Sequence, residues 1–261
     1  MPEFDGIIFS DLHLAPGRDR LNNLFEAFVK RVEGTPHVAC LGDLFEYWMG
    51  YMQLRNEHGR WAYDLMIRLA KGARTAIWID GNRDFMFGKE ARLAGYTARR
   101  NLWEGDFAGT RVALEHGDRF CTLDKEYQRF RFWFRKLPWR FLQTFFTEKM
   151  GHNLAKKLRA KSKGQVVRRN PSQFGIQREG VERLILRGAK IVVCGHVHSP
   201  FVRTYAPAKD PGKLMVLSDW REEGAVVCTV KDGNFELVKF NGTDFEPFEA
   251  PTEQQVFAPG M

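Results

Sequence analysis

The sequence predicts an α/β fold, and two features of its apolar residues lead to that prediction. Through most of the chain, short apolar runs typical of buried strands alternate with segments whose apolar residues follow helical spacing. Near the C-terminus, three further apolar runs follow one another without a helical pattern between them. We therefore expect a sheet flanked by helices, with a second, more antiparallel sheet packed on it.

The apolar pattern places each expected element along the chain. Strands are expected at residues 6–10, 38–41, 75–79, 111–115, 190–194, 214–217, 224–230 and 235–240. Helices are expected to include residues 21–32, 61–69 and 181–185, where apolar residues recur every three or four positions. Asp232 and Gly233 supply a turn between the last two strands. The tail at 241–261 shows no clear periodicity, and its role is not predicted from the sequence.

The size and composition favour a single globular domain over residues 1–261. No run of about 18 apolar residues occurs, and the N-terminus lacks the basic and apolar segments of a secretory signal. We therefore expect a cytoplasmic protein. The cysteines form no CxxC pair and are expected to be reduced thiols; they are Cys40, Cys121, Cys194 and Cys228.

Residue types that bind metals occur where five of the expected strands end. They are Asp11 and His13, Asp43, Asn82, His116, and His196 and His198. Ligands of α/β folds bind in the crevice outside the carboxyl ends of strands, and a glycine adjoins four of the five sites, which allows close approach of the backbone. A single Asp or His at a strand end is more often a cap or a hydrogen-bonded core residue. Five such sites in succession favour a metal centre, with ligands that suit Mn²⁺, Fe or Zn²⁺.

These motifs, in this order and spacing, resemble the calcineurin-like metallophosphoesterase superfamily. The resemblance implies a sandwich of two mixed β-sheets flanked by helices, with two divalent metal ions. One ion would be bound by Asp11, His13, Asp43 and His198, and the other by Asp43, Asn82, His116 and His196, so that Asp43 would bridge them. Two such ions can activate water and bind a phosphate for in-line attack.

The residue after the third motif departs from the superfamily pattern. Most members have His there, but this chain has Arg83, which cannot donate a proton near neutral pH and whose planar guanidinium suits a diphosphate. The run 82–85 is similar to UDP-2,3-diacylglucosamine pyrophosphohydrolases of bacterial lipid A synthesis, as are parts of 42–48, 116–131 and 159–163. Val197 and Ser199 replace the Thr and Arg typical of that family.

This narrower resemblance implies a reaction and the residues that perform it. A metal-bridging hydroxide would attack the α-phosphorus of UDP-2,3-diacylglucosamine and release UMP and 2,3-diacylglucosamine 1-phosphate, with Mn²⁺ as the expected metal. The residues with a catalytic role would be Asn82, Arg83 and His196. Those that contact the substrate would be Asn82, Arg83, Asp124, Tyr127, Arg159, Ser162, Lys163 and His196.

Residues 122–173 interrupt the alternation of strands and helices and are expected to form a helical lid. Between Arg119 and Asn170 the chain has 15 Lys and Arg against 3 Asp and Glu, so this segment accounts for its +8 net charge. Apolar residues in this segment follow helical spacing, with basic residues between them, and Pro138 is expected to break or kink the helix. The apolar residues are Phe130, Phe134, Leu137, Phe141 and Phe145. A basic and aromatic segment of this kind is suited to bind acyl chains and to contact an anionic membrane surface.

Several alternatives remain open at this point. The lid could be an ordinary amphipathic helix pair or a nucleic-acid surface, but the phosphoesterase motifs favour a lipid, and we expect neither a nucleic-acid nor a protein partner. The enzyme could instead be a related phosphodiesterase, a nucleotide diphosphatase acting on a soluble substrate, or a DNA nuclease. A non-catalytic scaffold is disfavoured because every ligand position holds a competent residue. The leading hypothesis is a lipid A pathway hydrolase, peripheral on the cytoplasmic face of the bacterial inner membrane.

Overall fold

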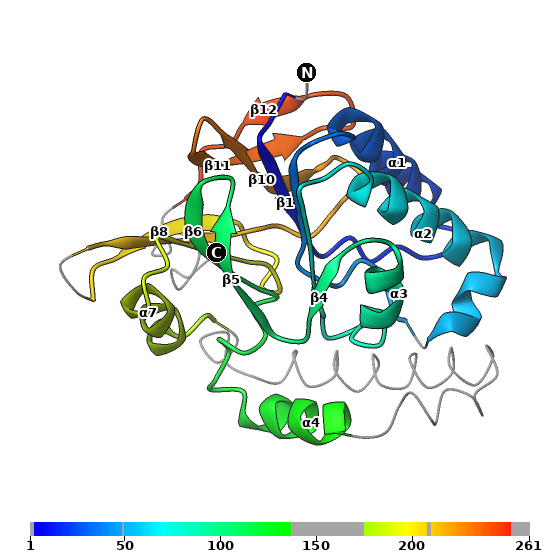
Figure 1. The fold of residues 1–261 in the computed structure, drawn as a ribbon. Coiled ribbons are helices and arrows are strands. Elements are labelled where there is room, and N and C mark those ends of the chain that lie inside the picture. Colours follow the sequence, from blue (N-terminus) through cyan, green and yellow to red (C-terminus); the bar gives the residue numbers. More distant parts are fainter. Residues whose placement is uncertain (1–2, 49, 137–174, 208–209, 252–261) are drawn as a thin grey trace.

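The computed structural model describes residues 3–48, 50–136, 175–207 and 210–251 of the 261-residue chain. Two β-sheets stack against each other, and helices pack on the outer face of each (Figure 1). The predicted α/β class with two mixed sheets is therefore confirmed. Within these residue ranges, no helix combines the length and the apolar character needed to cross a membrane.

The first sheet contains seven strands. They are β1 (Gly6–Phe9), β2 (His37–Cys40), β3 (Thr75–Ile79), β4 (Thr97–Arg99), β10 (Ala225–Lys231), β11 (Asn234–Phe240) and β12 (Phe245–Pro247). Their order across the sheet is β12-β11-β10-β1-β2-β3-β4. Strands β1 to β4 are parallel to one another. Strand β10 pairs antiparallel with β1, β11 with β10, and β12 with β11.

The second sheet contains five strands. They are β5 (Leu102–Phe107), β6 (Thr110–Glu115), β7 (Ile191–Cys194), β8 (Phe201–Tyr205) and β9 (Gly212–Val216). Their order is β5-β6-β7-β9-β8, in which β6, β7 and β9 are parallel and the two edge strands are antiparallel to their neighbours.

Apart from α4, which lies at an edge of the sandwich, the helices divide between the two outer faces (Figure 1). They are α1 (Asp19–Val32), the 3₁₀ helix η1 (Tyr51–Arg55), α2 (Glu57–Ala70), α3 (Gly88–Leu93), α4 (Lys125–Lys136) and α7 (Arg178–Leu186). Successive residues of β1 point to opposite layers: Ile7 packs in the cluster with α1 and α2, and Ile8 packs between the sheets. Helix α7 covers the second sheet, where Leu184 and Val192 belong to one cluster.

The C-terminal strands do not form a separate antiparallel sheet, so this part of the prediction was wrong. Strand β10 is buried from Ala225 to Val230 and pairs with β1, and β11 extends the same sheet. Strand β9 lies in the other sheet beside β7. An apolar pattern shows that a strand is buried but not which strand it pairs with. The predicted hairpin is confirmed, since Asp232 and Gly233 have φ values of 51° and 76°, as a type I′ turn requires.

Six short elements of the described residues were not predicted: η1, α3, β4, β5, β8 and β12. Strand β12 falls inside the tail for which no element was expected, and it pairs with β11. The predicted reduced cysteines are confirmed as free thiols, and all four are buried. Of the lid predicted at 122–173, the structure describes residues 122–136, which include α4, and residues 137–173 lie outside the described residues.

Candidate active site

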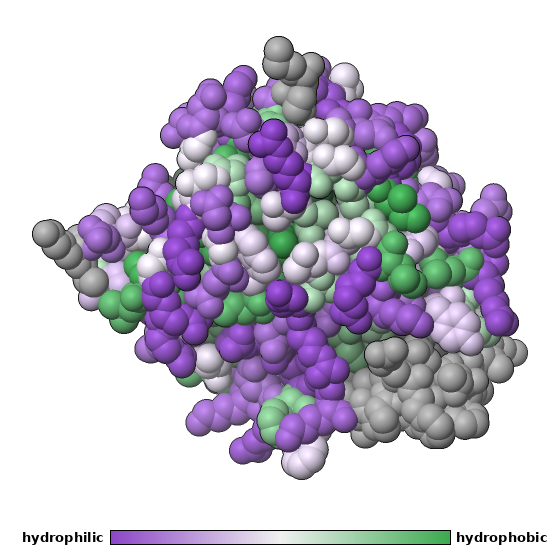
Figure 2. Space-filling view, in the orientation of Figure 1, coloured by the Kyte–Doolittle hydropathy of each residue, from purple (hydrophilic) through white to green (hydrophobic). Residues whose placement is uncertain are grey.

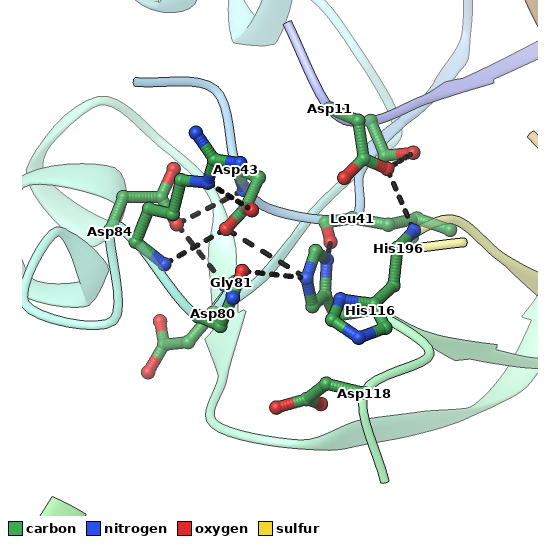
Figure 3. A network of polar contacts seen from close by, with 12 residues as sticks. Asp11, Leu41, Asp43, Asp80, Gly81, Asp84, His116, Asp118 and His196 are labelled. Carbon is green, nitrogen blue, oxygen red and sulfur yellow. Dashed lines mark hydrogen bonds and ion pairs between the residues drawn. The ribbon is translucent and has the colours of Figure 1, made fainter. Parts of the chain in front are cut away.

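The strand ends that the sequence singled out meet at one edge of the sandwich (Figure 3). The seven predicted ligand residues lie there: Asp11 and His13 after β1, Asp43 after β2, Asn82 after β3, His116 after β6, and His196 and His198 after β7. Several hydrogen bonds join the sheets at this edge. His116 Nδ1 lies 2.9 Å from the Leu41 carbonyl oxygen, and the His196 backbone N–H donates to Asp11 Oδ2 at 3.0 Å.

The ligand atoms form two adjacent groups. In the first, Asp11, His13 and His198 offer atoms that all lie within 4.8 Å of one another, with His198 Nε2 3.3 Å from Asp11 Oδ1 and 3.4 Å from His13 Nε2. In the second, Asp11, Asp43 and His116 meet the same limit, and His116 Nε2 lies 3.8 Å from Asp43 Oδ1. Two groups of this size, side by side, fit a centre with two metal ions.

Two polar contacts at this site are best satisfied by a cation. His13 Nδ1 is buried, lies 4.0 Å from Asp43 Oδ2 and has no hydrogen-bond partner among the described residues. The Asn82 amide lies against the Asp43 carboxylate, and without a cation this contact is favourable only when the amide nitrogen donates to Asp43 Oδ1 at 2.9 Å. With a cation between them, the amide oxygen can face the carboxylate instead. The residues present therefore fit a divalent metal.

The backbone of the ligand residues adopts a conformation that is rare for residues other than glycine. Seven described non-glycine residues have a positive φ, and five of them are predicted ligands: Asp11 (57°), His13 (55°), Asp43 (52°), His196 (71°) and His198 (58°). Such conformations cost of order 1–3 kcal/mol each and are concentrated at functional sites. The strain is therefore independent support for a functional role of these five residues.

Glycines beside the ligands allow the strand ends to approach one another, as predicted from their positions. A Cβ at Gly42, whose φ is 87°, would collide with the backbone of Gly81. A Cβ at Gly81 would collide with the side chain and backbone nitrogen of Asp43, and one at Gly195 with Asp11 and Ser10. These turns touch each other so closely that no side chain fits between them.

We expect Gly81→Ala to lower the hydrolytic rate by roughly 10²-fold, because the new methyl group must displace Asp43 and a shift of about 1 Å at reacting groups has a cost of this size. The measurement is kcat at saturating metal. Gly72→Ala is the matched control: its φ of 82° imposes backbone strain, but a Cβ there meets no atom within 4 Å. Equal rates for the two variants would show that the close contact at Gly81 does not position the site.

The histidines of the site have pKa values that burial and neighbouring charges shift in different directions. Burial, together with the charge of His116, lowers the pKa of His196 to about 4. Burial and the nearby Arg83 guanidinium lower the pKa of His13. Burial also disfavours protonation of His116, but Asp43 and Asp11 outweigh it and raise its pKa. Neutral imidazole is the form that binds metal, so His13 and His196 are ready for that role near neutral pH.

Asp84 connects the turns of two proposed ligands, and no role was predicted for it from the sequence. Its carboxylate accepts hydrogen bonds from the backbone N–H groups of Asp43 (3.1 Å), Leu44 (2.7 Å) and Gly81 (3.1 Å). Burial and the neighbouring Asp43 carboxylate raise the pKa of Asp84 to about 8. A buried Asp two residues after a ligand gives no signal in the sequence, because its partners are backbone groups about 40 residues away in the chain.

Arg83, the residue directly after Asn82, lies at the rim of the site. Its backbone N–H donates to Asp43 Oδ1 at 2.9 Å, and its Nε lies 3.4 Å from Asp43 Oδ2. Its Nη1 donates to Glu46 Oε1 at 2.9 Å, and 28% of the side chain is exposed. The guanidinium is therefore held by two carboxylates next to the proposed metals and can still be reached from solvent.

The structure describes two of the further residues expected to contact substrate. Tyr127 lies on α4 with its ring centroid 6.1 Å from that of His196, and its hydroxyl donates to Asp118 Oδ2 at 2.7 Å. Asp124 is the N-cap of the same helix, since its Oδ1 accepts from the Tyr127 backbone N–H at 3.0 Å. Arg159, Ser162 and Lys163, which were also expected at the substrate, lie outside the described residues.

Comparison with known proteins agrees with this geometry. Residues 7–200 match the sequence model of the calcineurin-like phosphoesterase family. A protein of Shewanella piezotolerans, named UDP-2,3-diacylglucosamine hydrolase, is 33% identical over 237 residues, which cover 89% of this chain and 97% of the relative. A protein of the same name from Shewanella loihica is 34% identical over 245 residues, covering 91% and 98%, and one from Aeromonas salmonicida is 31% identical, covering 85% and 89%. The chain therefore belongs to the calcineurin-like phosphoesterase family and is a metal-dependent hydrolase.

Proposed function

We propose that this protein hydrolyses the diphosphate of UDP-2,3-diacylglucosamine at the α-phosphorus, giving UMP and 2,3-diacylglucosamine 1-phosphate in lipid A synthesis. The observation that supports this most is similarity over almost the whole length of relatives that carry this hydrolase name, in a chain whose seven ligand positions all hold competent residues at one site. Arg83, beside the third motif, adds a cation suited to a diphosphate.

The proposed metal centre contains two divalent ions, with Mn²⁺ as the expected metal. Asp11, His13, Asp43 and His198 would hold one ion, and Asp43, Asn82, His116 and His196 the other, so Asp43 belongs to both. When bound, such ions neutralise phosphate charge and lower the pKa of water, which supplies the nucleophile. The Leu41 carbonyl holds His116 Nδ1 so that Nε2 faces the site, and the Ser10 hydroxyl, donating at 2.6 Å, orients the Asp11 carboxylate.

The remaining catalytic roles belong to groups at the rim. Asn82 and His196 would also contact a phosphate oxygen, and the Arg83 guanidinium would stabilise the negative charge that develops on the diphosphate. Arg83 does not act as a proton donor in this proposal, because guanidinium stays protonated at neutral pH. Glu46, through its hydrogen bond with Nη1, would hold the guanidinium at the rim.

Helix α4 supports a lipid partner through the orientation of its faces. Two of its arginines point inward: the side chains of Arg131 and Arg135 are 13% and 10% exposed. Three of its aromatic residues point outward, with Phe130 45%, Phe132 53% and Trp133 67% exposed, next to Leu123 at 50%. Figure 2 shows apolar side chains among hydrophilic ones over α4. An amphipathic helix packed on the core would show the opposite orientation, so the exposed aromatic face favours acyl chains or a membrane surface.

The proposal is tested by measuring Mn²⁺-dependent release of UMP from UDP-2,3-diacylglucosamine, with UDP-glucose as the unacylated control. We expect rapid turnover of the acylated substrate and little of the control. Equal turnover of both would favour a nucleotide diphosphatase acting on soluble substrates. No bound ion and no hydrolysis after addition of Mn²⁺ would favour a scaffold without activity.

We expect Arg83→Ala to lower kcat for the acylated substrate by roughly 10²–10³-fold, the usual cost of losing one electrostatic stabiliser of a transition state. Arg83→Lys keeps the charge but not the planar pair of donors, so its rate should lie between those of the wild type and the alanine variant. Steady-state kinetics at saturating Mn²⁺ measure this. A near-normal rate for Arg83→Ala would remove the guanidinium from the mechanism.

The outward aromatic face leads to a prediction about membranes. We expect the double variant Phe132→Ala/Trp133→Ala to sediment less with anionic lipid vesicles than the wild type, because it removes exposed apolar side chains of α4. Leu93→Ala is the control, since Leu93 is an apolar residue on another helix, α3, and is 71% exposed. Unchanged sedimentation of the double variant would show that this face does not bind the bilayer.

A further inference from the structure

Helix α4 packs against the protein through a stripe of polar side chains. Tyr127, Arg131 and Arg135 are spaced four residues apart, which places them on one face of the helix. Hydrogen bonds from these three side chains reach two loops that lie far apart in the sequence, one that includes Gly81 and one that includes Asp118. Each of these loops also contains a proposed metal ligand, Asn82 or His116.

Arg135 makes the contact with the first of these loops. Its Nη2 donates to the carbonyl oxygen of Gly81 at 2.8 Å and to that of Asp80 at 3.4 Å. Its Nη1 donates to the Arg100 carbonyl oxygen at 2.7 Å and to Asn101 Oδ1 at 3.0 Å. A buried guanidinium with this many partners holds them in a fixed arrangement, since its donors are rigid and planar.

The Gly81 carbonyl is a sensitive place for such a contact. It belongs to the peptide group that ends at the Asn82 nitrogen, so its hydrogen bond fixes the orientation of the peptide leading into that ligand. The preceding peptide is fixed from the other side, because the Gly81 N–H donates to Asp84. The Asn82 side chain extends from this doubly held turn, and its Oδ1 lies 3.3 Å from His116 Nε2.

The second anchor is Asp118, two residues after His116. Its Oδ2 accepts from the Tyr127 hydroxyl at 2.7 Å and from Arg131 Nε at 2.6 Å, and lies 3.8 Å from Arg135 Nη2. The Gln128 side chain donates to the Asp118 carbonyl oxygen at 2.7 Å. In Figure 3 Asp118 lies beside His116, on the chain segment that continues from it. The loop of His116 is thus held by the same helix that holds the turn of Asn82.

We infer that Arg135 is a positioning residue for one half of the metal centre, acting through the Gly81 carbonyl on Asn82 and, with Arg131, through Asp118 on His116. The inference rests on the ligand assignment of the proposed function, in which Asn82 and His116 bind the same ion. Docking of α4, which begins the lid segment, then sets the affinity of that ion. The other ion shares Asp43 with this one, but its remaining ligands, Asp11, His13 and His198, follow β1 and β7, so its binding is not expected to respond.

The test is calorimetric titration of the full-length, metal-free protein with Mn²⁺, comparing Arg135→Ala with wild type. Loss of a group that orients a ligand costs about 10–100-fold in metal affinity, so we expect one of two ions to bind that much more weakly and the other to bind as before. Hydrolysis of the soluble diester bis(p-nitrophenyl) phosphate should fall at low Mn²⁺ and recover at high Mn²⁺. Arg129→Ala, which removes an exposed arginine of the same helix, is the control.

Two results would overturn the inference: two-ion binding identical to that of Arg129→Ala, or equal weakening of both ions, which would indicate general loosening. Should Arg135→Ala fail to fold, Arg135→Lys keeps a cation that reaches one carbonyl oxygen, and the same two results decide. Wild-type protein that binds no Mn²⁺ would overturn the proposed function itself. The use of a soluble diester keeps the outcome independent of whether the natural substrate is a lipid.

Discussion

Asp43→Ala is expected to abolish measurable hydrolysis, with a loss greater than the roughly 10²–10³-fold cost of removing a single electrostatic stabiliser. The Asp43 carboxylate lies at the centre of the site: its Oδ2 is 4.0 Å from His13 Nδ1 and 3.4 Å from Arg83 Nε, and its Oδ1 is 3.8 Å from His116 Nε2. As the proposed bridging ligand, Asp43 takes part in holding both ions, so its removal should weaken the binding of both.

Two measurements separate this explanation from simple unfolding. Kinetics at saturating Mn²⁺ give the loss of rate, and circular dichroism of the metal-free protein shows whether the fold persists. Asp43→Asn, which keeps the shape and one oxygen, should retain more metal binding than Asp43→Ala. Asp64→Ala, at an exposed carboxylate on α2, controls for loss of one negative charge. A folded Asp43→Ala protein with two ions and a rate within tenfold of wild type would contradict the bridging role.

The clustering of the proposed ligands could be predicted from the sequence because strand burial and residue type both mark their positions. Asp11, Asp43 and His116 each come directly after, or within a few residues of, an apolar run, and all three are almost fully buried. Parallel strands of a sheet end at a common edge, so chain order alone brings such residues together. The rare backbone conformations of these turns could not be predicted, since a positive φ of 52° at Asp43 depends on the neighbouring Gly42 and Gly81.

The arrangement of strands and the orientation of α4 could not be predicted for a related reason. Strand β10 is buried from Ala225 to Val230, and nothing in its residue pattern shows that it pairs with β1, more than 200 residues earlier. Strand β4 has two exposed residues of three, Thr97 and Arg99, so it has no apolar signal. In α4, aromatic and basic residues alternate along the helix, and the partners that draw Arg131 inward, such as Asp118, lie outside it.

The second large expected effect concerns stability and arises from Asp84, the buried carboxylate that joins the turn after β2 to the turn after β3. Asp84→Ala leaves the backbone N–H groups of Asp43, Leu44 and Gly81, the three closest of the four backbone donors to this carboxylate, without their acceptor. An unsatisfied buried donor costs about 1–3 kcal/mol, so even the lower value for three donors lowers the free energy of unfolding by roughly 3 kcal/mol. For a chain of this size that corresponds to a fall in Tm of roughly 6–12 °C.

Asp84→Asn separates the loss of acceptors from the loss of volume. Asp84 Oδ1 accepts from Asp43 and Gly81, and Oδ2 from Leu44, so an amide oxygen can replace only one of these acceptors while the amide nitrogen faces a backbone donor. The asparagine variant should therefore also be destabilised, although it fills the same space. Urea unfolding of the metal-free proteins at a pH above 8, where the Asp84 carboxyl is ionised, measures both changes against wild type. Asparagine fills the same space as aspartate but loses an acceptor oxygen. If Asp84→Asn unfolds at the wild-type urea concentration while Asp84→Ala unfolds at a lower one, packing rather than hydrogen bonding holds the two turns together.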